Sequence, residues 1–447
     1  MTLTHRRIIY SFFIVVFLIA VWIIVLRVSG YKYDFTRNSW EKTGMIFLET
    51  KPEVVSVYLN DKLVGEKTPL RIKDLLPNKY KLRIEKGGWG KWEKEVQISA
   101  GQTDNIQYVR IFREKEIPKM VLKGEILQSV ISPNGEKVLI LKQGDKKELI
   151  LSLVDLNDGS EIEIKRMTMS ESVKRMEFID NGARAAVFSQ NNVRLISLNN
   201  SAVETNLSEI LNNKKLNSIK IADGDSENVY YINNEQLWKY NWLLRKEELL
   251  LPYTPIDYLP GNGKIYFLSN EFLSSISFKI LDIENKKEPE NVAFWEKGEY
   301  QFLGTGGRFL TVKKDSDLLV VDVLNKKTEL VRGGHYAKWG NSQTEMLFGD
   351  SYELWIYRPM AEDNKYLILT RAGSNINSSE WYPPESHIFY AESGKIKILE
   401  NMEKERWAVE LGQFDEVKEI FINKKGDKLF FVGSVAQTPG FYQLDIQ

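Results

Sequence analysis

The residues best suited to bind a ligand gather in one short segment and at one later position. The segment Gly333-Gly-His-Tyr-Ala-Lys-Trp339 places His335 beside Tyr336 and Trp339, and Trp381 occupies the equivalent position of a later repeat. An imidazole and aromatic rings suit hydrogen bonding to, and stacking on, a polar ligand in a pocket. We predict a ligand-binding role for these four residues. The alternative interpretation is structural: a packed loop with a satisfied histidine, and indoles that fill the space between repeats.

The residue types that most catalytic centres need are absent or too few. The chain has no cysteine, which excludes disulfides, thiol nucleophiles and thiolate metal sites, and its three histidines are too few for an imidazole metal centre. It has no Gly-x-Ser-x-Gly elbow, no phosphate-binding loop and no dinucleotide-binding glycine pattern. We therefore predict no catalytic residues, no cofactor and no metal. An enzyme built on this chain would need converging carboxylates.

Two acidic clusters resemble calcium loops only in composition. Asp223-Gly-Asp-Ser-Glu227 and Asp155-Leu-Asn-Asp158 offer several oxygen ligands, but neither has the spacing or the closing glutamate of an EF-hand. Both fall where the repeat needs a turn, and we interpret them as turns.

Because Lys+Arg and Asp+Glu are 61 each, no basic excess favours nucleic acid as a partner.

An uncharged apolar stretch runs from Ile8 to Leu26. As a helix it would span roughly 28 Å, close to the thickness of the hydrocarbon core of a bilayer. We predict a transmembrane helix over residues 8–26 that contacts membrane lipid. A cleaved signal peptide is the alternative, although no small-x-small cleavage site follows the stretch.

The flanking charges do not decide the orientation, because basic residues occur on both sides of the stretch. The preceding tail, residues 1–7, is short, and long downstream domains are translocated largely regardless of their charge. We predict a cytoplasmic N-terminus and an extracytoplasmic bulk. Tyr31, Tyr33, Phe35 and Trp40, in the linker 27–43, then lie where an interfacial aromatic belt is expected.

Residues 44–113 have short alternating strands separated by dense turn signals, which predicts a small antiparallel β-sandwich. Its motifs follow in order: Pro52-Glu53, Gly65-x-x-Thr-Pro-Leu70, Leu76-Pro-x-x-Tyr80 and Gly88-Trp-x-x-Trp92. This order resembles the PEGA domain. The resemblance implies an extracytoplasmic bacterial or archaeal module without catalytic residues of its own.

The chain departs from the PEGA pattern at two turns. Val54 and Val55 replace the Gly-Ala of the motif that names the family, and Asn78 stands where the family has glycine. These departures concern turn geometry more than the fold.

From residue 119 to residue 447 a turn cluster runs into a hydrophobic burst eight times, about once every 40 residues, the signature of a β-propeller. The eight bursts are 131–141, 178–188, 222–232, 259–268, 303–312, 338–348, 381–390 and 422–432. We predict eight blades. Seven is the alternative, if the weak unit around Asp223 belongs to a connection.

The last unit ends after Asp445, before any outer strand. An unpaired edge would result, so we predict that Met120-Val-Leu122 supplies the missing strand and closes the ring. The units resemble TolB/WD40-like repeats, whose Trp-Ser-Pro-Asp-Gly-Lys pattern is echoed by Ile131-Ser-Pro-Asn-Gly-Glu-Lys137.

The sequence thus predicts an all-β chain with one N-terminal transmembrane helix, a PEGA-like sandwich and a propeller. The predicted function is non-catalytic binding or scaffolding at the cell envelope, with an envelope protein or polysaccharide as partner. The alternative is a propeller hydrolase or lyase that acts on envelope glycans or peptides.

Overall fold

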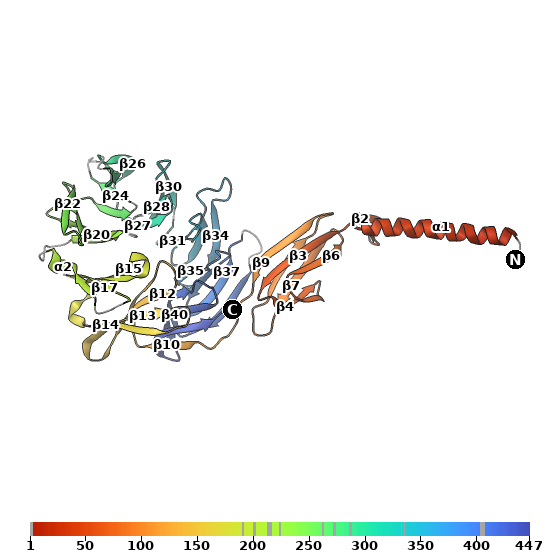
Figure 1. The fold of residues 1–447 in the computed structure, drawn as a ribbon, viewed down its shortest axis with the longest axis horizontal. Helices are drawn as coiled ribbons and strands as arrows, with labels where there is room; N and C mark the ends of the chain where they lie inside the picture. Colours follow the sequence, from red (N-terminus) through yellow and green to blue (C-terminus); the bar gives the residue numbers. More distant parts are fainter. Residues whose placement is uncertain are drawn as a thin grey trace. The chain divides into compact units, whose positions relative to one another are not determined.

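The computed structural model describes residues 3–189, 192–199, 203–211, 217–222, 225–261, 263–270, 274–285, 288–331, 333–334, 336–402 and 407–447. The chain divides into two compact units, one formed mainly by Met1–Lys115 and the other mainly by Glu116–Ile446. Figure 1 shows the ribbon, coloured along the sequence.

The first unit begins with helix α1, Leu3–Val28. Its segment Arg7–Val28 is long and apolar enough to cross a membrane, and none of it is buried against the rest of the protein. The helix is apolar all round, as expected for a segment surrounded by lipid. It contains the stretch 8–26 and is longer at both ends.

The predicted linker 27–43 contains a β-hairpin, β1 (Tyr31–Asp34) paired with β2 (Ser39–Lys42). Two sheets follow it. The first has the order β6 (Leu70–Leu75), β3 (Gly44–Lys51), β9 (Thr103–Arg110). The second has the order β5 (Lys62–Lys67), β4 (Val54–Leu59), β7 (Lys79–Glu85), β8 (Trp92–Gln97).

The core of these two sheets comes from alternating apolar residues such as Ile46, Leu48, Val57, Leu82 and Ile84, all fully buried. The prediction of a purely antiparallel sandwich is wrong in one pairing, since β3 and β9 run parallel. Parallel neighbours need a long crossover, and here the whole second sheet lies between them in the sequence. Strand alternation predicts faces but does not specify this direction.

The described part of the second unit contains eight four-stranded sheets, seven of them built from four consecutive strands. Those in the first half are β11 (Ile126–Ile131), β12 (Lys137–Gln143), β13 (Glu148–Asp155), β14 (Glu161–Thr168); β15 (Val173–Ile179), β16 (Arg184–Ser189), β17 (Val193–Ser197), β18 (Glu204–Asn206); and β19 (Asn217–Ala222), β20 (Asp225–Asn233), β21 (Gln236–Asn241), β22 (Lys246–Leu251). Those in the second half are β23 (Asp257–Gly261), β24 (Lys264–Ser269), β25 (Ser275–Asp282), β26 (Glu290–Glu296); β27 (Tyr300–Gly306), β28 (Phe309–Lys314), β29 (Asp317–Asp322), β30 (Lys327–Val331); β31 (Tyr336–Trp339), β32 (Met346–Gly349), β33 (Glu353–Tyr357), β34 (Tyr366–Arg371); and β35 (Ile376–Trp381), β36 (His387–Glu392), β37 (Lys395–Glu400), β38 (Ala408–Gln413). A short helix, α2 (Leu207–Ile210), and the 3₁₀ turns η1 (Asp145–Lys147), η2 (Met169–Glu171) and η3 (Asp180–Gly182) connect some of the strands.

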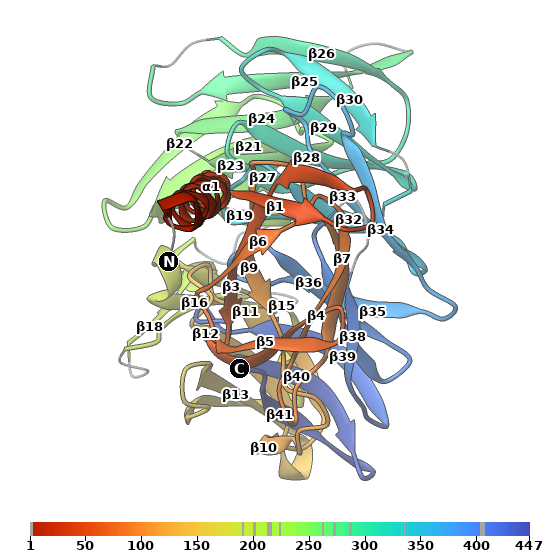
Figure 2. The same ribbon diagram turned by 90° about the vertical axis from the view of Figure 1, so that its right-hand side faces the viewer.

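The eighth sheet combines the two ends of the unit. Its order is β10 (Lys119–Lys123), β41 (Thr438–Asp445), β40 (Lys428–Val435), β39 (Glu416–Ile422). Strand β10 pairs antiparallel with β41, with Met120 opposite Tyr442 and Leu122 opposite Phe441. Figure 2 shows β10 beside β41 and β40. The predicted closure by residues 120–122 is confirmed.

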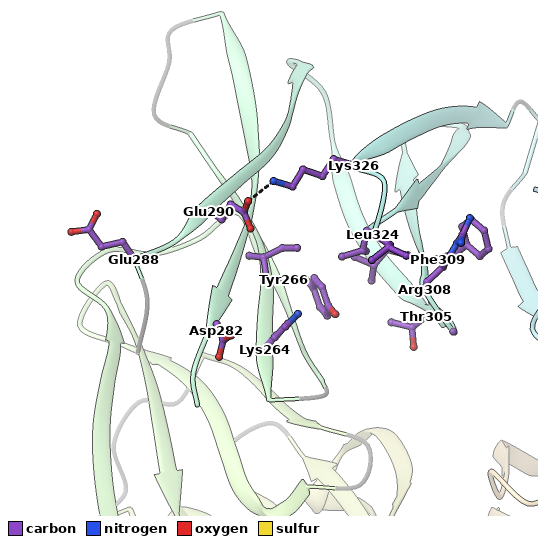
Figure 3. Close-up of a pocket in the computed structure, with 14 residues that line it drawn as sticks. Lys264, Tyr266, Asp282, Glu288, Glu290, Thr305, Arg308, Phe309, Leu324 and Lys326 are labelled. Atoms are coloured by element: carbon purple, nitrogen blue, oxygen red, sulfur yellow. Dashed lines mark hydrogen bonds and ion pairs between the residues drawn. The ribbon is translucent and has the colours of Figure 1, made fainter. Parts of the chain in front are cut away.

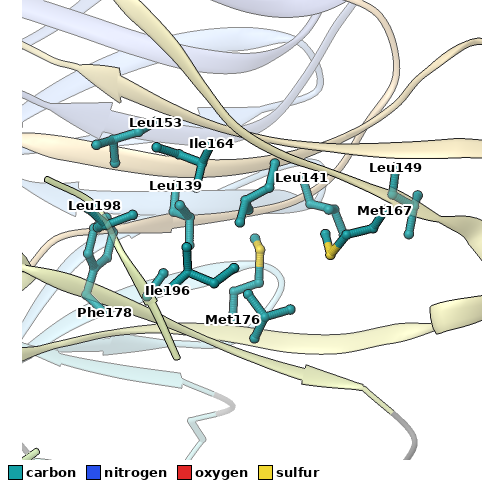
Figure 4. Packing of buried hydrophobic residues seen from close by; sticks show 13 residues of the cluster. Leu139, Leu141, Leu149, Leu153, Ile164, Met167, Met176, Phe178, Ile196 and Leu198 are labelled. Carbon is teal, nitrogen blue, oxygen red and sulfur yellow. The ribbon is translucent and has the colours of Figure 1, made fainter. Parts of the chain in front are cut away.

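Each hydrophobic burst forms the second strand of its sheet, and these strands are buried on both faces. In β12 the four central residues are buried, and in β36 all six are. A strand covered on both sides has a continuous rather than an alternating apolar run. Figure 4 shows the packing between the first two complete sheets, where Leu139 and Leu141 meet Met176 and Ile196. The core of the unit is therefore distributed between neighbouring sheets.

Most first strands contact the first strand of the next sheet. Hydrogen bonds join the remaining pairs: Arg175 on β15 donates to the carbonyl of Ile219 on β19, Lys338 on β31 donates to the carbonyl of Ser379 on β35, and Ser129 on β11 donates to Glu419 on β39. The sheets therefore form a closed ring, and the prediction of a propeller is confirmed. The weak unit around Asp223 is a full four-stranded sheet, β19–β22, although Asp223 itself lies outside the described residues. The cluster Asp155–Asp158 is a turn, because Asp155 Oδ1 accepts a hydrogen bond from the backbone N–H of Asn157 at 2.8 Å.

Candidate functional site

Two of the four predicted ligand-binding residues come from strand β31 and one from β35. His335 lies outside the described residues. The Tyr336 hydroxyl shares a hydrogen bond of 2.9 Å with the Ser379 hydroxyl on β35, so the tyrosine joins two neighbouring sheets. Burial raises the pKa of Tyr336 to about 12. This phenol is therefore neutral and engaged within the ring.

The two tryptophans also connect neighbouring sheets. The Trp339 indole N–H donates to the Thr311 hydroxyl at 2.9 Å, and its ring stacks on Phe309 with the ring centres 5.5 Å apart. The Trp381 indole N–H donates to the carbonyl of Lys338 at 3.0 Å. Both N–H groups thus bond to an adjacent sheet. This is the packing role between repeats that the sequence analysis gave as the alternative to ligand binding.

A set of charged side chains on the first strands also joins the sheets. Lys220 on β19 lies 2.6 Å from Asp257 on β23 and also donates to the carbonyl of Tyr258. The second oxygen of Asp257 accepts the backbone N–H of Phe302 on β27 at 2.8 Å. One ion pair therefore connects three consecutive sheets, and each of its charges has further hydrogen bonds, as partly buried charges require.

A comparable group lies on the first strands of the last sheets. Lys338 on β31 is 2.8 Å from Glu380 on β35 and donates to the carbonyl of Ser379 at 2.9 Å. Glu419 on β39 accepts a hydrogen bond from Ser129. Burial raises the pKa of Glu419, against the opposing effects of the Ser129 hydroxyl and the Lys338 ammonium. These contacts connect the last sheets of the ring to its first sheet.

A cavity of about 870 Å³ opens beside the first of these groups. The first strands β15, β19, β23 and β27 supply most of its wall, and the rings of Tyr266, Tyr300 and Phe302 take part in it. The carboxylate of Glu177 lines it too, 3.2 Å from the guanidinium of Arg175. Burial raises the pKa of Glu177, while the cation of Arg175 opposes that shift.

Uncharged polar groups also face this cavity. Gln301 and Thr305 on β27 line it and are exposed, and the described residues provide no hydrogen-bond partner for these two side chains. Ser218 on β19 lines it too, but its side chain is hydrogen-bonded to the Tyr258 hydroxyl. The four charged residues on the same wall, in contrast, are all paired. The cavity therefore offers amide and hydroxyl groups beside aromatic rings, a combination suited to a neutral polar ligand.

A smaller cavity of about 440 Å³ adjoins it and shares Tyr266 and Thr305 with it. Figure 3 shows this cavity between the sheets β23–β26 and β27–β30. The dashed line marks the ion pair between Lys326 and Glu290, which connects the two sheets at its edge. Phe309 contributes an apolar wall.

The described residues contain no group of three or more His, Asp or Glu side chains arranged to hold a metal ion. The sequence analysis did not single out the inner-wall charges or the cavity residues. Polar residues occur on every first strand and throughout the chain, and only the position of the strand within its sheet identifies those that face the cavity. A charged residue at or just before the start of the turn cluster, as in Lys338 and Glu380, recurs in most units and was the available signal, although Ser129 and Gln301 stand there in two of them.

Comparison with known proteins agrees with this architecture. The PEGA domain family matches residues 43–111. These residues are a PEGA domain. A search of curated proteins finds no match.

Among solved structures, the C-terminal WD40 domain of Sif2 is 11% identical, with a TM-score of 0.50, 74% of this chain covered and 99% of that one. The Dos1 propeller is 12% identical, with a TM-score of 0.49, 74% of this chain covered and 95% of that one. At this identity the likeness to the Sif2 domain shows a WD40-like propeller fold and nothing further.

Proposed function

We propose that this chain is a membrane-anchored, extracytoplasmic binding protein whose propeller holds a neutral polar ligand, such as a segment of an envelope protein or polysaccharide. Three features support the proposal: the apolar helix α1, the PEGA domain and the cavity of about 870 Å³. PEGA domains are typically extracellular. The N-terminus would then be cytoplasmic and the ring would face outwards.

The observation that supports the binding role is that the charged residues of the cavity wall are paired with each other, whereas uncharged polar residues of the same wall remain available to a ligand. Arg175 and Glu177 pair with each other on β15, and Lys220 and Asp257 pair between two sheets. The groups left for a ligand are amides, hydroxyls and aromatic rings, which orient and hold a polar molecule but do not transfer protons at neutral pH. Such a wall suits recognition better than catalysis.

A binding experiment tests the proposal in the full-length protein, solubilised in mild detergent and carrying a tag after Gln447. The variant Gln301→Ala/Thr305→Ala removes two of the uncharged groups from the cavity. The matched control Gln102→Ala/Thr103→Ala removes the same residue types from an exposed position of the first unit. We expect wild type and control to retain a protein from membrane extracts, or to co-sediment with purified envelope polysaccharide, and the cavity variant to lose that binding. Equal retention by all three proteins would refute the cavity as the binding site.

The location is tested separately. Protease added to intact cells should remove the tag after Gln447 if the propeller faces outwards. Because the cell surface and the periplasm both lie outside the cytoplasmic membrane, the test is repeated on cells stripped of their outer envelope. A tag that is cleaved only after the cytoplasmic membrane is broken would refute the proposed orientation.

The second candidate is a hydrolase or lyase, favoured by one observation. Glu177, whose pKa is raised by burial, and the ion-paired Asp257 line the same cavity, and two carboxylates in different environments can serve as acid and base. The isosteric variants Glu177→Gln and Asp257→Asn separate the two functions. Glycan or peptide cleavage by wild type that both substitutions abolish would establish the enzyme, whereas retained binding without any turnover supports the binding protein.

A further inference from the structure

Helix α1 turns directly into the hairpin β1–β2. Gly30 adopts φ +82°, a left-handed conformation that glycine tolerates best, and its carbonyl accepts hydrogen bonds from both the backbone N–H and the hydroxyl of Thr43 at 2.8 and 2.9 Å. The two ends of the hairpin are thereby held at the end of the helix, within the first unit. Figure 1 shows β2 beside the last turns of α1.

The hairpin folds back against the helix through a row of aromatic rings. Trp40 on β2 meets Trp22 of the helix edge to face, with ring centres 5.9 Å apart. Tyr33 contacts Trp40 at 5.5 Å and Phe35 at 5.1 Å. Phe35 stands at the turn with 86% of its surface exposed, and Trp22 is 57% exposed. The row therefore joins the helix to the tip of the hairpin and leaves much apolar surface uncovered by protein.

The position of Trp22 in the helix fixes the level of this contact. At 1.5 Å per residue, Arg7 and Arg27 are about 30 Å apart along the helix, which equals the hydrocarbon thickness of a bilayer. Trp22 precedes Arg27 by five residues, or about 8 Å. The headgroup layer adds about 5–8 Å on each side of the hydrocarbon. With Arg27 in the outer part of that layer and the long side chain of Arg7 extending to the opposite headgroups, Trp22 lies at the boundary between headgroups and acyl chains, and its partner Trp40 lies near that depth.

We propose that the hairpin β1–β2 is a second membrane-binding element, seated in the interfacial layer of the bilayer with Phe35 inserted and held there by the contact between Trp22 and Trp40. This inference rests on the proposed membrane-spanning role of α1. Tryptophan and tyrosine are enriched at that layer because their rings are apolar and their N–H and O–H groups are polar. The hairpin has two unpaired edges, whose backbone groups need water or headgroups, so it cannot sink further into the hydrocarbon.

Seating in the interface gives the first unit a fixed attachment to the membrane instead of a free tether. A flexible linker would allow the sheets to rotate about the end of the helix. A hairpin that contacts both the helix and the lipid removes much of that freedom. The charged residues at the hairpin are compatible with headgroup contact, because they are paired. Arg37 pairs with Glu41 at 3.1 Å, and the buried Asp34 accepts the backbone N–H of Thr36 at 2.8 Å and lies 4.0 Å from Arg37.

The chain has no cysteine, so single cysteines can be labelled without background. Phe35→Cys carries a polarity-sensitive fluorophore to the tip of the hairpin. Val15→Cys places it in the helix, and Lys62→Cys places it at an exposed site of the same unit, at the start of β5. The full-length variants are reconstituted into vesicles of phosphatidylcholine and phosphatidylglycerol in equal parts, with or without doxyl-labelled lipid as quencher.

We expect the labels at positions 35 and 15 to lose a comparable fraction of their emission to the quencher and the label at position 62 to lose none. If the label at position 15 is quenched but the labels at positions 35 and 62 are not, the inference about the hairpin is overturned, while α1 remains a membrane anchor. Absence of quenching at all three positions would overturn the anchor as well. Adding Trp40→Ala to Phe35→Cys should reduce quenching at position 35. Unchanged quenching there would overturn the role of the contact between Trp22 and Trp40.

Discussion

Ring closure by β10 leads to a quantitative prediction at Leu122. This side chain is 2% exposed and belongs to a cluster that contains Ile140 from the first complete sheet and Phe430 and Phe441 from the last. It therefore fills the junction at which the two ends of the propeller meet. Leu122→Ala removes three buried carbon atoms and leaves a cavity in that junction.

A substitution of this kind costs about 2–5 kcal/mol, from the lost transfer of apolar surface and the lost packing around the cavity. Met120 on the same strand provides the control, since it is 41% exposed. Met120→Ala should change the free energy of unfolding by less than about 1 kcal/mol, as is usual for a partly exposed side chain.

The assay is urea unfolding of the full-length protein in mild detergent, followed by tryptophan fluorescence. The urea midpoint should fall for Leu122→Ala at an unchanged slope, and should hardly move for Met120→Ala. If unfolding is irreversible, the unfolding rate at fixed urea gives the same comparison. Equal effects of the two substitutions, or a change below about 1 kcal/mol at Leu122, would refute the view that β10 is packed into the ring.

Two further predictions concern the contacts between sheets. Gly306→Ala should destabilise the propeller by about 1–3 kcal/mol or more, as overpacking does. The reason is that the new methyl group would lie 2.1 Å from the Trp339 ring. The control Gly261→Ala places its methyl group where no atom lies within 4 Å, and it should be neutral. Thermal unfolding of both variants checks the difference. Burial raises the pKa of Glu419 above 4.5. The native state therefore holds the proton of this carboxyl more tightly than the unfolded chain does. The contribution of Glu419 to the free energy of unfolding falls as pH rises above 4.5. Glu419→Gln, which still accepts a hydrogen bond from Ser129, should flatten that fall in unfolding measured from pH 4 upwards, and identical pH profiles would contradict the assignment.

The repeat and its closure were predictable from sequence because both depend on hydrophobic pattern. The turn between Ser132 and Lys137 corresponds to the best-preserved repeat motif. It is closed by a hydrogen bond from the Ser132 N–H to the Lys137 carbonyl at 2.8 Å and by one from the Lys137 N–H to the Ser132 hydroxyl at 2.9 Å. A turn closed in the same way joins Asn423 and Lys428, although the motif there is degenerate. The backbone hydrogen bond needs no particular residue type, and a serine hydroxyl in one turn and an asparagine oxygen in the other accept the second bond. The turn is therefore kept after the rest of the motif has been lost.

The hairpin β1–β2 and the cavity were not predicted. The sequence Tyr31-Lys-Tyr-Asp34 alternates as a strand does, and Asn38 adopts a left-handed turn conformation, so a hairpin signal was present in what was interpreted as a linker. The cavity left no such signal. Gln301 and Thr305 are ordinary polar residues until their strand is placed innermost in its sheet, which depends on contacts between residues far apart in the chain.

The construction of the ring limits where a ligand can bind and what can recognise it. Second strands are buried on both faces by neighbouring sheets, so their side chains are committed to the core. On the first strands, Lys220 and Lys338 each bond to the next sheet and are also committed, because removing either would leave a partly buried carboxylate unpaired. Specificity must therefore come from residues that neither core nor ring requires. On the described cavity wall these are the uncharged side chains, above all Gln301 and Thr305, and they can vary between related propellers without loss of the fold.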